Sequence, residues 1–356
     1  MKRIVLTGGG TTGHVTPNLA LIDPLEQSGW RIDYIGSEQG IERTMMEKEG
    51  IAYHAIRTGK LHRYLTWKNI LAPFQVMKGI VQAFQHLRRL RPDVVFSKGG
   101  FVAFPVVLSA WLLKIPVIAH ESDLTPGLAN RLCFPFVNQL CLAFAGTQQH
   151  FKKHHQRIQV TGTPIREVLF HGQKLRALKH CGWDGSKPVL LVMGGSLGSQ
   201  MMNQHIRQVL PTLIKTFHVI HLCGPGKRDV ALDNIADYFQ CEYAFEEMPD
   251  FLAASDVVVS RSGANSLYEL LALAKPHVLI PLSKKASRGD QIENAHYFEQ
   301  QGISVVIEEQ HLTSERLQQD IERVFHESDE RIRRMKVLNT QSATEQIMEM
   351  IESLQK

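Results

Sequence analysis

The sequence predicts an α/β protein built from two Rossmann-like, doubly wound parallel-sheet domains. Short apolar strands alternate with helical segments along the chain, as in parallel sheets that helices cover on both faces. The alternation comes in two series, which begin with "RIVLT" (3–7) and "PVLLVMGGSLG" (188–198). Each series opens with a strand and a glycine turn, which is typical of a Rossmann-like domain. The length of 356 residues also favours two domains.

The boundary between the two domains is expected near "VTGTPIR" (160–166), where a Gly-Thr-Pro turn follows a basic, histidine-rich stretch. We therefore place the first domain at residues 1–161 and the second at residues 162–340. Segment 341–356 has a helical pattern, and we expect it to pack back on the first domain.

Composition limits the classes of partner. The formal net charge is +5, which suits an anionic partner, but the charge is diffuse and no nucleic acid is expected. The five cysteines form no C-x-x-C pair, which favours reduced thiols in a cytoplasmic protein. The apolar run 101–119 is interrupted by Pro105, Lys114 and Pro116, so it predicts a buried helix and strand rather than a membrane span.

The first glycine turn, "IVLTGGGTTGHVTP" (4–17), has the spacing of a dinucleotide fingerprint at Gly8, Gly10 and Gly13. The fingerprint alone leaves three interpretations open: a nicotinamide site, another diphosphate site, or a tight turn without a ligand. Similar turns occur at "MGGSLGSQ" (193–200) and "RSGANSLYE" (261–269). One nicotinamide does not need phosphate-type turns in both domains, so the set favours a shared nucleotide sugar.

The third turn offers specific groups for such a ligand. Ser262, Gly263 and Ala264 are expected at a helix N-terminus, which suits a diphosphate. Glu269 would follow one to two turns later, either as an acceptor for ribose hydroxyls or as a surface glutamate. The chain has no D-x-D sequence and no spaced His/Cys cluster, so we expect no metal site and no cofactor. Backbone dipoles and cations would then stabilise a leaving diphosphate, with Arg166 and Arg261 as candidates.

Seven motifs in order give the chain a close resemblance to the MurG family of N-acetylglucosaminyltransferases over essentially its whole length. They are "GGTTGHVTP" (9–17), "SKGGFVAFP" (97–105), "HESDLTPGLAN" (120–130), "GTPIR" (162–166), "GGSLG" (194–198), "RSGANSLYE" (261–269) and "DQIENA" (290–295). The resemblance implies a GT-B fold, in which the two domains face a cleft that holds the active site. It also implies inverting, metal-independent transfer of GlcNAc from UDP-GlcNAc to the MurNAc 4-hydroxyl of lipid I (undecaprenyl-diphosphoryl-MurNAc-pentapeptide), which forms lipid II in peptidoglycan synthesis.

The resemblance also implies roles for individual residues. Thr11, Thr12, Gly13 and His14 would lie beside the sugar and the acceptor. Because His14 directly follows the turn and an imidazole suits proton transfer, we take His14 as the candidate base and Asp123 as the alternative. Arg166 and Ser196 would serve the nucleotide and phosphate side, and Phe245 would meet uracil largely through its backbone. Phosphates and ribose would be held by Ala264, Asn265, Ser266, Leu267, Tyr268 and Glu269. Gln291, with Asn294 nearby, would contact sugar hydroxyls.

Several positions depart from the family pattern. Thr12 replaces the usual glycine, Ser122 and Asp123 replace a glutamine and an asparagine, and Thr163 replaces an asparagine before proline. Phe101 stands for a common tyrosine, and Asp290 also departs from the pattern before Gln291. These changes bear on substrate preference more than on fold or donor class.

Residues 67–91 suggest how the protein reaches a lipid-linked acceptor. Ile70, Phe74, Met77, Val81 and Phe84 follow helical spacing and are expected to be core. Leu71, Val76 and Ile80 fall off this stripe and would form a second, exposed apolar face. Lys68, Lys78, Arg88, Arg89 and Arg91 accompany them, as suits an anionic membrane surface. We expect a peripheral protein at the cytoplasmic face of the cell membrane.

Other functions remain open from the sequence. They are a GT-B transferase with another lipid or small-molecule acceptor, an epimerase of UDP-GlcNAc, and a catalytically silent UDP-GlcNAc-binding paralogue.

Overall fold

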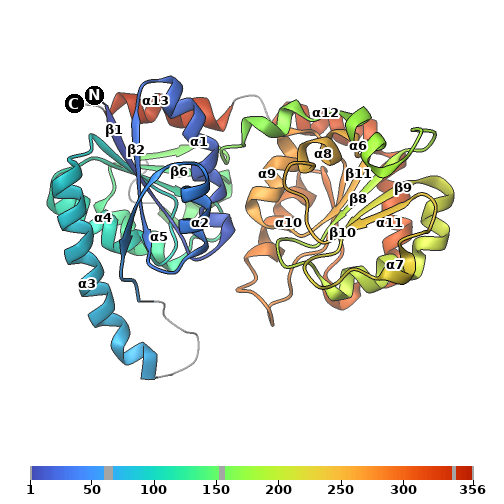
Figure 1. The fold of residues 1–356 in the computed structure, drawn as a ribbon, viewed down its shortest axis with the longest axis horizontal. Coiled ribbons are helices and arrows are strands. Elements are labelled where there is room, and N and C mark those ends of the chain that lie inside the picture. The colour runs from blue at the N-terminus through green and yellow to red at the C-terminus, as the bar shows by residue number, and fades with distance from the viewer. Residues whose placement is uncertain (1, 60–66, 152–156, 339–341, 355–356) are drawn as a thin grey trace. The chain divides into compact units, whose positions relative to one another are not determined.

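The chain folds into two compact units, each a parallel sheet with helices packed against it (Figure 1). The computed structural model describes residues 2–59, 67–151, 157–338 and 342–354, and for residues 67–73 it describes the backbone alone. The first unit contains Met1–Arg166 and Gln341–Lys356, and the second contains Glu167–Thr340. The prediction of two doubly wound parallel-sheet domains is confirmed.

The first unit has a seven-stranded parallel sheet with the order β3-β2-β1-β4-β5-β6-β7. The strands are β1 (Arg3–Thr7), β2 (Arg31–Ser37), β3 (Ala52–Ile56), β4 (Val94–Ser97), β5 (Val117–Glu121), β6 (Gln139–Leu142) and β7 (Ile158–Val160). The chain builds outward from β1 to β3 and then returns to the other side of β1 with β4. Strand order therefore reverses at β1 and β4, which is where doubly wound sheets bind ligands.

Alternation along the strands supplies two cores, one on each face of this sheet. Ile4 and Leu6 of β1 point to one face, and Val5 points to the other. The Ile4 face is covered by α1 (Thr16–Gln27), α2 (Ile41–Lys48) and α13 (Ala343–Ser353). The Val5 face is covered by α3 (Trp67–Leu90), α4 (Ala103–Leu112) and α5 (Leu128–Cys133). The apolar run 101–119 thus forms a helix and the buried strand β5, as predicted.

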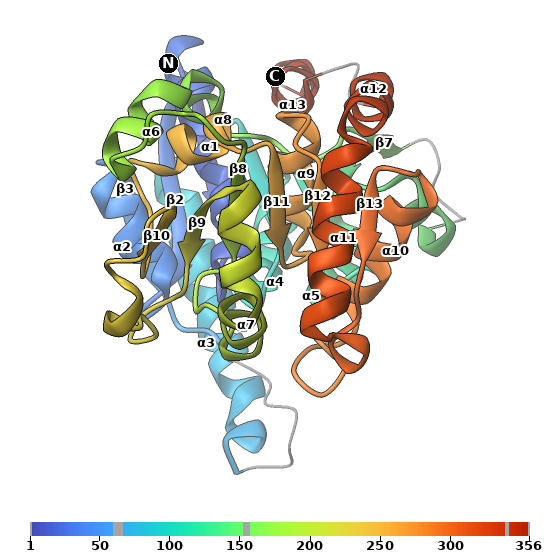
Figure 2. The ribbon, with the colours of Figure 1, turned by 90° about the vertical axis from the view of Figure 1, so that its right-hand side faces the viewer.

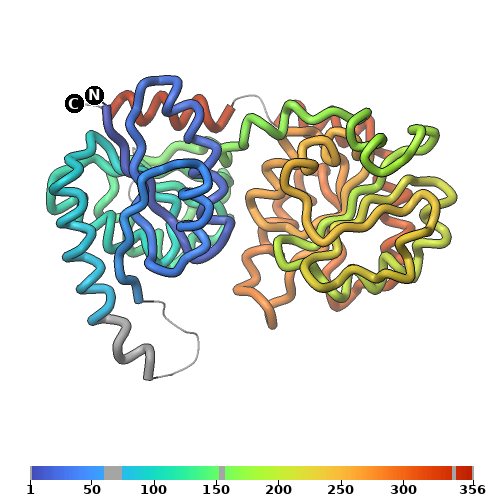
Figure 3. Tube along the Cα trace, viewed as in Figure 1, coloured from blue at the N-terminus to red at the C-terminus, as the bar shows by residue number. Residues whose placement is uncertain are grey.

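The C-terminal helix α13 belongs to the first unit. It lies along α1, and the tube in Figure 3 shows the red C-terminal segment returning beside the blue N-terminal one. Ile347, Met350 and Ile351 are buried with residues of α1 and the sheet, and the Cys141 thiol meets the Met350 sulfur at 3.5 Å. The chain consequently leaves the first unit after Arg166 and returns to it after Thr340.

The second unit has a six-stranded parallel sheet with the order β10-β9-β8-β11-β12-β13, seen side by side in Figure 2. The strands are β8 (Val189–Met193), β9 (His218–Leu222), β10 (Tyr238–Cys241), β11 (Val257–Ser260), β12 (His277–Leu279) and β13 (Ser304–Val306). Its helices are α6 (Lys174–Cys181), α7 (Gln200–Thr216), α8 (Met248–Ala254), α9 (Ala264–Ala272), α10 (Asp290–Gln300), α11 (Ser314–His326) and α12 (Ser328–Leu338). Strand order reverses at β8 and β11, so this sheet has an equivalent switch point.

Helix α3 is rotated relative to the sequence prediction. Phe74, Met77 and Val81 were expected in the core, but their side chains are 69%, 60% and 53% exposed. The helix instead buries Ala83 and Leu87 against the sheet and α4.

Small residues on α3 account for this rotation. A Cβ at Gly79 would lie 2.2 Å from the carbonyl oxygen of Arg57, and the Ser109 hydroxyl donates to the carbonyl of Ile80 at 3.0 Å. Close backbone approach, rather than large apolar side chains, selects the buried face. Val76 and Ile80, expected to be exposed, are half-buried, and the side chain of Leu71 lies outside the described residues.

Among the described residues, no helix combines the length and the apolar character that crossing a bilayer requires.

Candidate active site

The glycine turn after β1 lies at the switch point of the first sheet. The turn leads into a short 3-10 helix, Thr12–His14, and then into α1. Thr11 and Gly13 are exposed, and Thr12 and His14 are half-buried. A Cβ at Gly13 would meet only the Thr11 hydroxyl, at 3.6 Å, so the surface beside this residue is open. The four predicted residues therefore form one accessible corner at the carboxyl end of β1.

The other glycines of this turn serve packing instead. A Cβ at Gly10 would lie 2.4 Å from the Phe101 ring, and one at Gly8 would lie 2.6 Å from the carbonyl oxygen of His14. The Gly10 amide donates to a buried carboxylate, Glu42, at 3.3 Å. A phosphate placed here would have to compete with that carboxylate for the amide and would be repelled by its charge. The Gly10 amide is therefore already hydrogen-bonded to the protein itself.

The side chain of His14 is positioned by Thr11. The imidazole Nδ1 and the Thr11 hydroxyl lie 2.9 Å apart, within one turn of the 3-10 helix. When the Thr11 hydroxyl donates to Nδ1, the proton of a neutral imidazole lies on Nε2. When the hydroxyl accepts from Nδ1, Nε2 is unprotonated and can take a proton. The Thr11 contact thus controls which nitrogen of His14 can act as a base.

Asp123 sits in a loop that follows β5, whose conformation depends on buried Glu121. One Glu121 carboxylate oxygen accepts from the Asp123 amide at 3.0 Å, and the other accepts from the Gly127 amide at 2.9 Å. From the opposite side, the Thr147 hydroxyl meets the carbonyls of Asp123 and Leu124 at 3.3 and 3.0 Å. Asp123 is half-buried at the same edge of the sheet as His14, with β4 between their two strands.

Sequence reasoning assigned no role to Lys98 and His120, although both stand in quoted motifs. Lys98 follows β4 and is 1% exposed, and its Nζ contacts Ser122 Oγ and lies 2.8 Å from His120 Nδ1. The His120 Nε2 lies 2.7 Å from the carbonyl of Gly162. The available signal was the charged Lys98 directly after the apolar strand "VVFS", where a buried position requires a partner.

In the second unit, the predicted residues follow three adjacent strands. Ser196 lies in the exposed glycine turn after β8, the 264–269 segment follows β11, and Gln291 follows β12. The Ser262 hydroxyl donates to the carbonyl of Gln291 at 2.8 Å, which joins the last two turns. The switch point thus collects three of the predicted donor-binding segments.

Arg261 is not a free cation, because its side chain links several segments of this region. We call these contacts the Arg261 brace. Its guanidinium donates to the Ser199 hydroxyl at 2.7 Å and to the carbonyl of Ile280 at 2.9 Å. It also forms a 2.7 Å ion pair with Glu309, and the two side chains are only 9% and 15% exposed. Burial lowers the pKa of Arg261, and the Glu309 carboxylate opposes that shift. The sequence interpretation of Arg261 as a diphosphate cation is therefore not supported by the geometry.

Helix α9 begins at Ala264, and its first amides have no side-chain cap, since Gly263 occupies the N-cap position. Backbone amides and the helix dipole at such an end attract anions. Asn265, Ser266 and Glu269 are half-buried, whereas Leu267 is fully buried and contributes packing through its side chain. Tyr268 packs edge-on against the Phe298 ring with centroids 5.7 Å apart.

Gln291 and Asn294 lie in the first turns of α10. The Gln291 side-chain oxygen accepts from the Leu282 amide at 3.1 Å, so its amide nitrogen is the group directed elsewhere. A Cβ at Gly263 would come within 4.0 Å of that nitrogen. Asn294 is buried below it.

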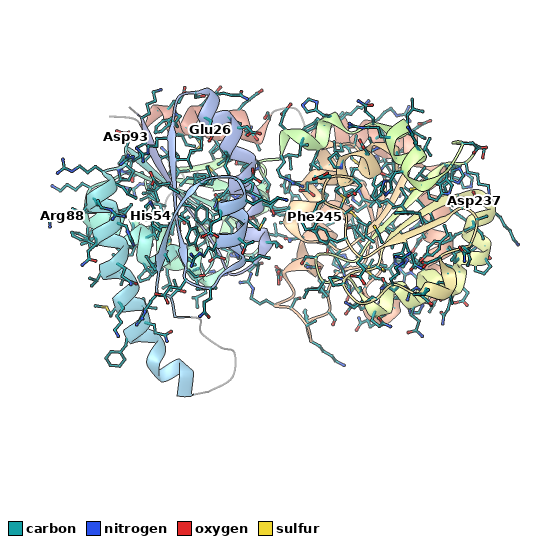
Figure 4. All side chains as sticks on the ribbon, in the orientation of Figure 1. Glu26, His54, Arg88, Asp93, Asp237 and Phe245 are labelled. Carbon is teal, nitrogen blue, oxygen red and sulfur yellow. The ribbon has the colours of Figure 1, made fainter. Side chains whose placement is uncertain are left out.

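Phe245 and Arg166 do not follow the strands at the switch point of the second sheet. Phe245, which is labelled in Figure 4, follows β10 at the edge of the sheet. Its exposed ring packs at a tilt against Tyr243, with ring centroids 4.1 Å apart. Its amide donates to Glu247 at 3.3 Å. Arg166 is half-buried at the end of the first unit, and its Nε is buried without a hydrogen-bond partner.

The described part of the chain contains no group of three or more His, Cys, Asp or Glu side chains placed to hold a metal ion.

Two domain families match successive parts of the chain and define its class. Residues 4–141 match the glycosyltransferase family 28 N-terminal domain, and residues 189–351 match the glycosyltransferase family 28 C-terminal domain. The chain belongs to glycosyltransferase family 28.

Individual relatives narrow the class further. A protein of Legionella pneumophila (strain Paris) is 54% identical over 348 residues, which is 98% of this chain and 96% of that protein. A protein of Clostridium tetani (strain Massachusetts / E88) is 49% identical over 99% of this chain and 98% of its own length. Both carry the name UDP-N-acetylglucosamine--N-acetylmuramyl-(pentapeptide) pyrophosphoryl-undecaprenol N-acetylglucosamine transferase.

A solved structure shares the fold. The MurG structure of Acinetobacter baumannii superposes with a TM-score of 0.77 at 23% identity, and covers 99% of this chain and 100% of that chain. The resemblance to the MurG family and the predicted GT-B class of fold are confirmed.

The brace predicts a specific stability defect. Arg261→Met leaves the Glu309 carboxylate buried without its cation, and should destabilise the protein by about 3–5 kcal/mol in urea unfolding. The double variant Arg261→Met/Glu309→Gln removes both charges and should recover part of that loss. Arg288→Met, an exposed arginine of the same unit, should stay within about 0.5 kcal/mol of wild type. Equal losses for Arg261→Met and Arg288→Met would contradict the brace.

Proposed function

We propose that this protein transfers GlcNAc from UDP-GlcNAc to the 4-hydroxyl of MurNAc in lipid I, with inversion at the anomeric carbon. The observation that carries the proposal is near-full-length identity of 49–54% to proteins named as that transferase. The arrangement of the second unit is consistent with it, because three segments suited to a sugar nucleotide meet at one switch point.

In the proposed reaction, the MurNAc 4-oxygen attacks the anomeric carbon of GlcNAc. The bond from that carbon to the UDP oxygen breaks, UDP leaves, and the acceptor proton passes to a base. The amides and dipole at the α9 N-terminus, which has no side-chain cap, would stabilise the diphosphate. Ser196, Asn265 and Ser266 would add hydroxyl and amide donors, and Arg166 a positive charge. Gln291 Nε2 would donate to a sugar hydroxyl, and Phe245 would contact uracil.

Glu269 is proposed to accept from the ribose hydroxyls. Glu269→Ala should weaken UDP-GlcNAc binding by about 1.5–3 kcal/mol, which is roughly 10- to 150-fold in Kd. Isothermal calorimetry measures this directly. Glu315→Ala, an exposed glutamate on α11, serves as the matched control and should leave the affinity unchanged. An unaltered affinity in Glu269→Ala would make Glu269 a surface residue.

His14 is proposed as the base and Asp123 as an acceptor for sugar hydroxyls. A general base contributes typically about 10²–10⁴-fold, so His14→Ala should lower kcat by that factor and keep donor affinity. Asp123→Asn, which introduces the residue usual in the family, should remain within about tenfold of wild type by the same scale. A large loss in Asp123→Asn with a mild one in His14→Ala would move the proton to Asp123. Single-turnover rates with a lipid I analogue distinguish the two patterns.

The acceptor is a membrane lipid, and helix α3 offers a surface for reaching it. Phe74, Met77 and Val81 are spaced on one exposed face, with Lys78 beside them. Arg88, whose side chain points away from the helix in Figure 4, and Arg89 extend the positive charge. Apolar side chains among cations suit an anionic leaflet, where each basic residue contributes about 1 kcal/mol. The protein would act as a peripheral enzyme at the cytoplasmic face of the membrane.

Replacing Phe74, Met77 and Val81 together with serine should reduce co-sedimentation with vesicles that contain anionic lipid. The side chains are already exposed, so the melting temperature should change little. Binding of the unaltered protein should weaken at high salt, because charge contributes to it. Calorimetry of UDP-GlcNAc binding checks that the second unit is intact. Undiminished vesicle binding in the triple variant would exclude this face of α3 as the membrane contact.

One assay separates the proposed function from its alternatives. Purified protein is incubated with labelled UDP-GlcNAc, with and without a lipid I analogue. The proposed transferase makes a labelled disaccharide lipid only when the acceptor is present. An epimerase would make a new sugar nucleotide without acceptor, and a silent paralogue would bind the donor and make nothing. A transferase with another acceptor would leave the lipid I analogue unlabelled and label that other acceptor when it is supplied.

A further inference from the structure

Lys98 is a buried cation for which the proposed reaction has no direct use. It follows β4 at the switch point of the first sheet, next to the glycine turn, and a Cβ at Gly8 would lie 3.1 Å from the Lys98 Cβ. With 1% exposure its ammonium is shielded from water, and it makes contacts with His120 and Ser122. Burying a lysine is costly unless its donors are satisfied, so this arrangement needs a reason.

The hydrogen bonds fix the direction of the network. The Gly162 carbonyl can only accept, so His120 Nε2 carries the proton that is shared across 2.7 Å. Burial and the nearby Lys98 charge hold the pKa of His120 well below its usual value, so the ring is neutral and its Nδ1 is bare. Lys98 therefore donates to His120 Nδ1 and to the Ser122 hydroxyl. In this tautomer His120 ties the lysine to the segment at Gly162.

Charged groups from two places act on the ammonium. The carboxylate of Glu121 lies on β5 and that of Asp123 in the following loop, and both favour the charged lysine. Cys141 on β6 also faces it, but burial raises the pKa of that thiol to about 12, so it is neutral. Burial lowers the pKa of Lys98 to about 8 against these two carboxylates. Both the carboxylate that anchors the loop and the candidate acceptor-binding carboxylate therefore favour the charged Lys98.

We propose that Lys98 is a positioning residue for the acceptor side of the site. Its ammonium holds Ser122 and, through it, the 122–127 loop, in the conformation that presents Asp123. This inference rests on the proposed function, because it assigns Asp123 to acceptor binding. At 1% exposure, Lys98 offers almost no surface for contact with a substrate, so the proposal assigns it a role through Ser122. This role gives both departures at 122 and 123 a reason. Ser122 accepts a hydrogen bond from the Lys98 ammonium, and the Asp123 carboxylate favours the charged lysine.

The kinetic test follows activity with a lipid I analogue between pH 6.5 and 9.5. In wild type, kcat/KM for the acceptor should fall above a pH of about 8, as Lys98 loses its proton and its hold on Ser122 weakens. Lys98→Met should be about tenfold lower at pH 7, the order expected for one charge-assisted hydrogen bond, and should lack the alkaline fall. Its affinity for UDP-GlcNAc should be unchanged. Lys179→Met, an exposed lysine of α6, should reproduce the wild-type profile.

A second readout needs no activity. Amide hydrogen exchange of a peptide that covers 122–127 should be faster in Lys98→Met than in wild type at pH 7, and unchanged in Lys179→Met. Ser122→Ala removes one partner of Lys98 at a half-buried position, so it tests the same contact if Lys98→Met fails to fold. It should speed exchange in the same peptide.

The outcomes are separable. The same alkaline fall in Lys98→Met, or unaltered exchange in the loop for both variants, would overturn the role of Lys98. A wild-type protein that makes no disaccharide lipid would overturn the proposed function instead, while the exchange experiment would still report whether Lys98 orders the loop.

Discussion

In each unit, the loops that carry candidate-site residues leave the sheet at the carboxyl ends of the strands. The strand hydrogen bonds stop there, so the order of the loops has to come from side chains. Buried charged groups supply it. Glu42 holds the first glycine turn through the Gly10 amide, and Glu121 holds the following loop through two amides. The Arg261–Glu309 ion pair orders the corresponding loops of the second unit. Burying a charged group costs desolvation free energy, which is offset only when the group makes all its hydrogen bonds. Each of these groups therefore favours the single loop conformation in which its partners are in place.

The sequence was sufficient for the framework of the fold. Apolar strands followed by small-residue turns predicted both sheets, and the position of each turn at a strand end followed from parallel topology. The face of α3 was not predictable in the same way. Which face of α3 is buried depends on the close approach of Gly79 to the backbone of Arg57, a residue on another segment. The periodicity of large apolar side chains gives no sign of such a contact. A local pattern carries no information about which neighbour a helix meets.

The candidate site divides along the same line. The family resemblance implied roles for Ser196 and Gln291, and the third small-residue turn suggested one for Glu269. The sheet order brings their three segments to neighbouring strands, β8, β11 and β12. Arg261 belongs to the same motif as Glu269, but its partners Ser199 and Glu309 come from distant segments. Only the three-dimensional structure therefore distinguishes a structural arginine from a ligand-binding one.

The replacement of the family's glycine by Thr12 causes no backbone strain. Thr12 lies in a 3-10 helix and has no positive φ, so any side chain is compatible with its conformation.

The return of α13 to the first unit has a consequence for biosynthesis. A ribosome delivers the chain from its N-terminus, so all strands of both sheets emerge before residues 343–353 do. The second unit can complete its core while the first still lacks Ile347, Met350 and Ile351 over the strip beside α1. The first unit therefore cannot cover the apolar strip beside α1 until the whole second unit has been synthesised, although its own strands are made first.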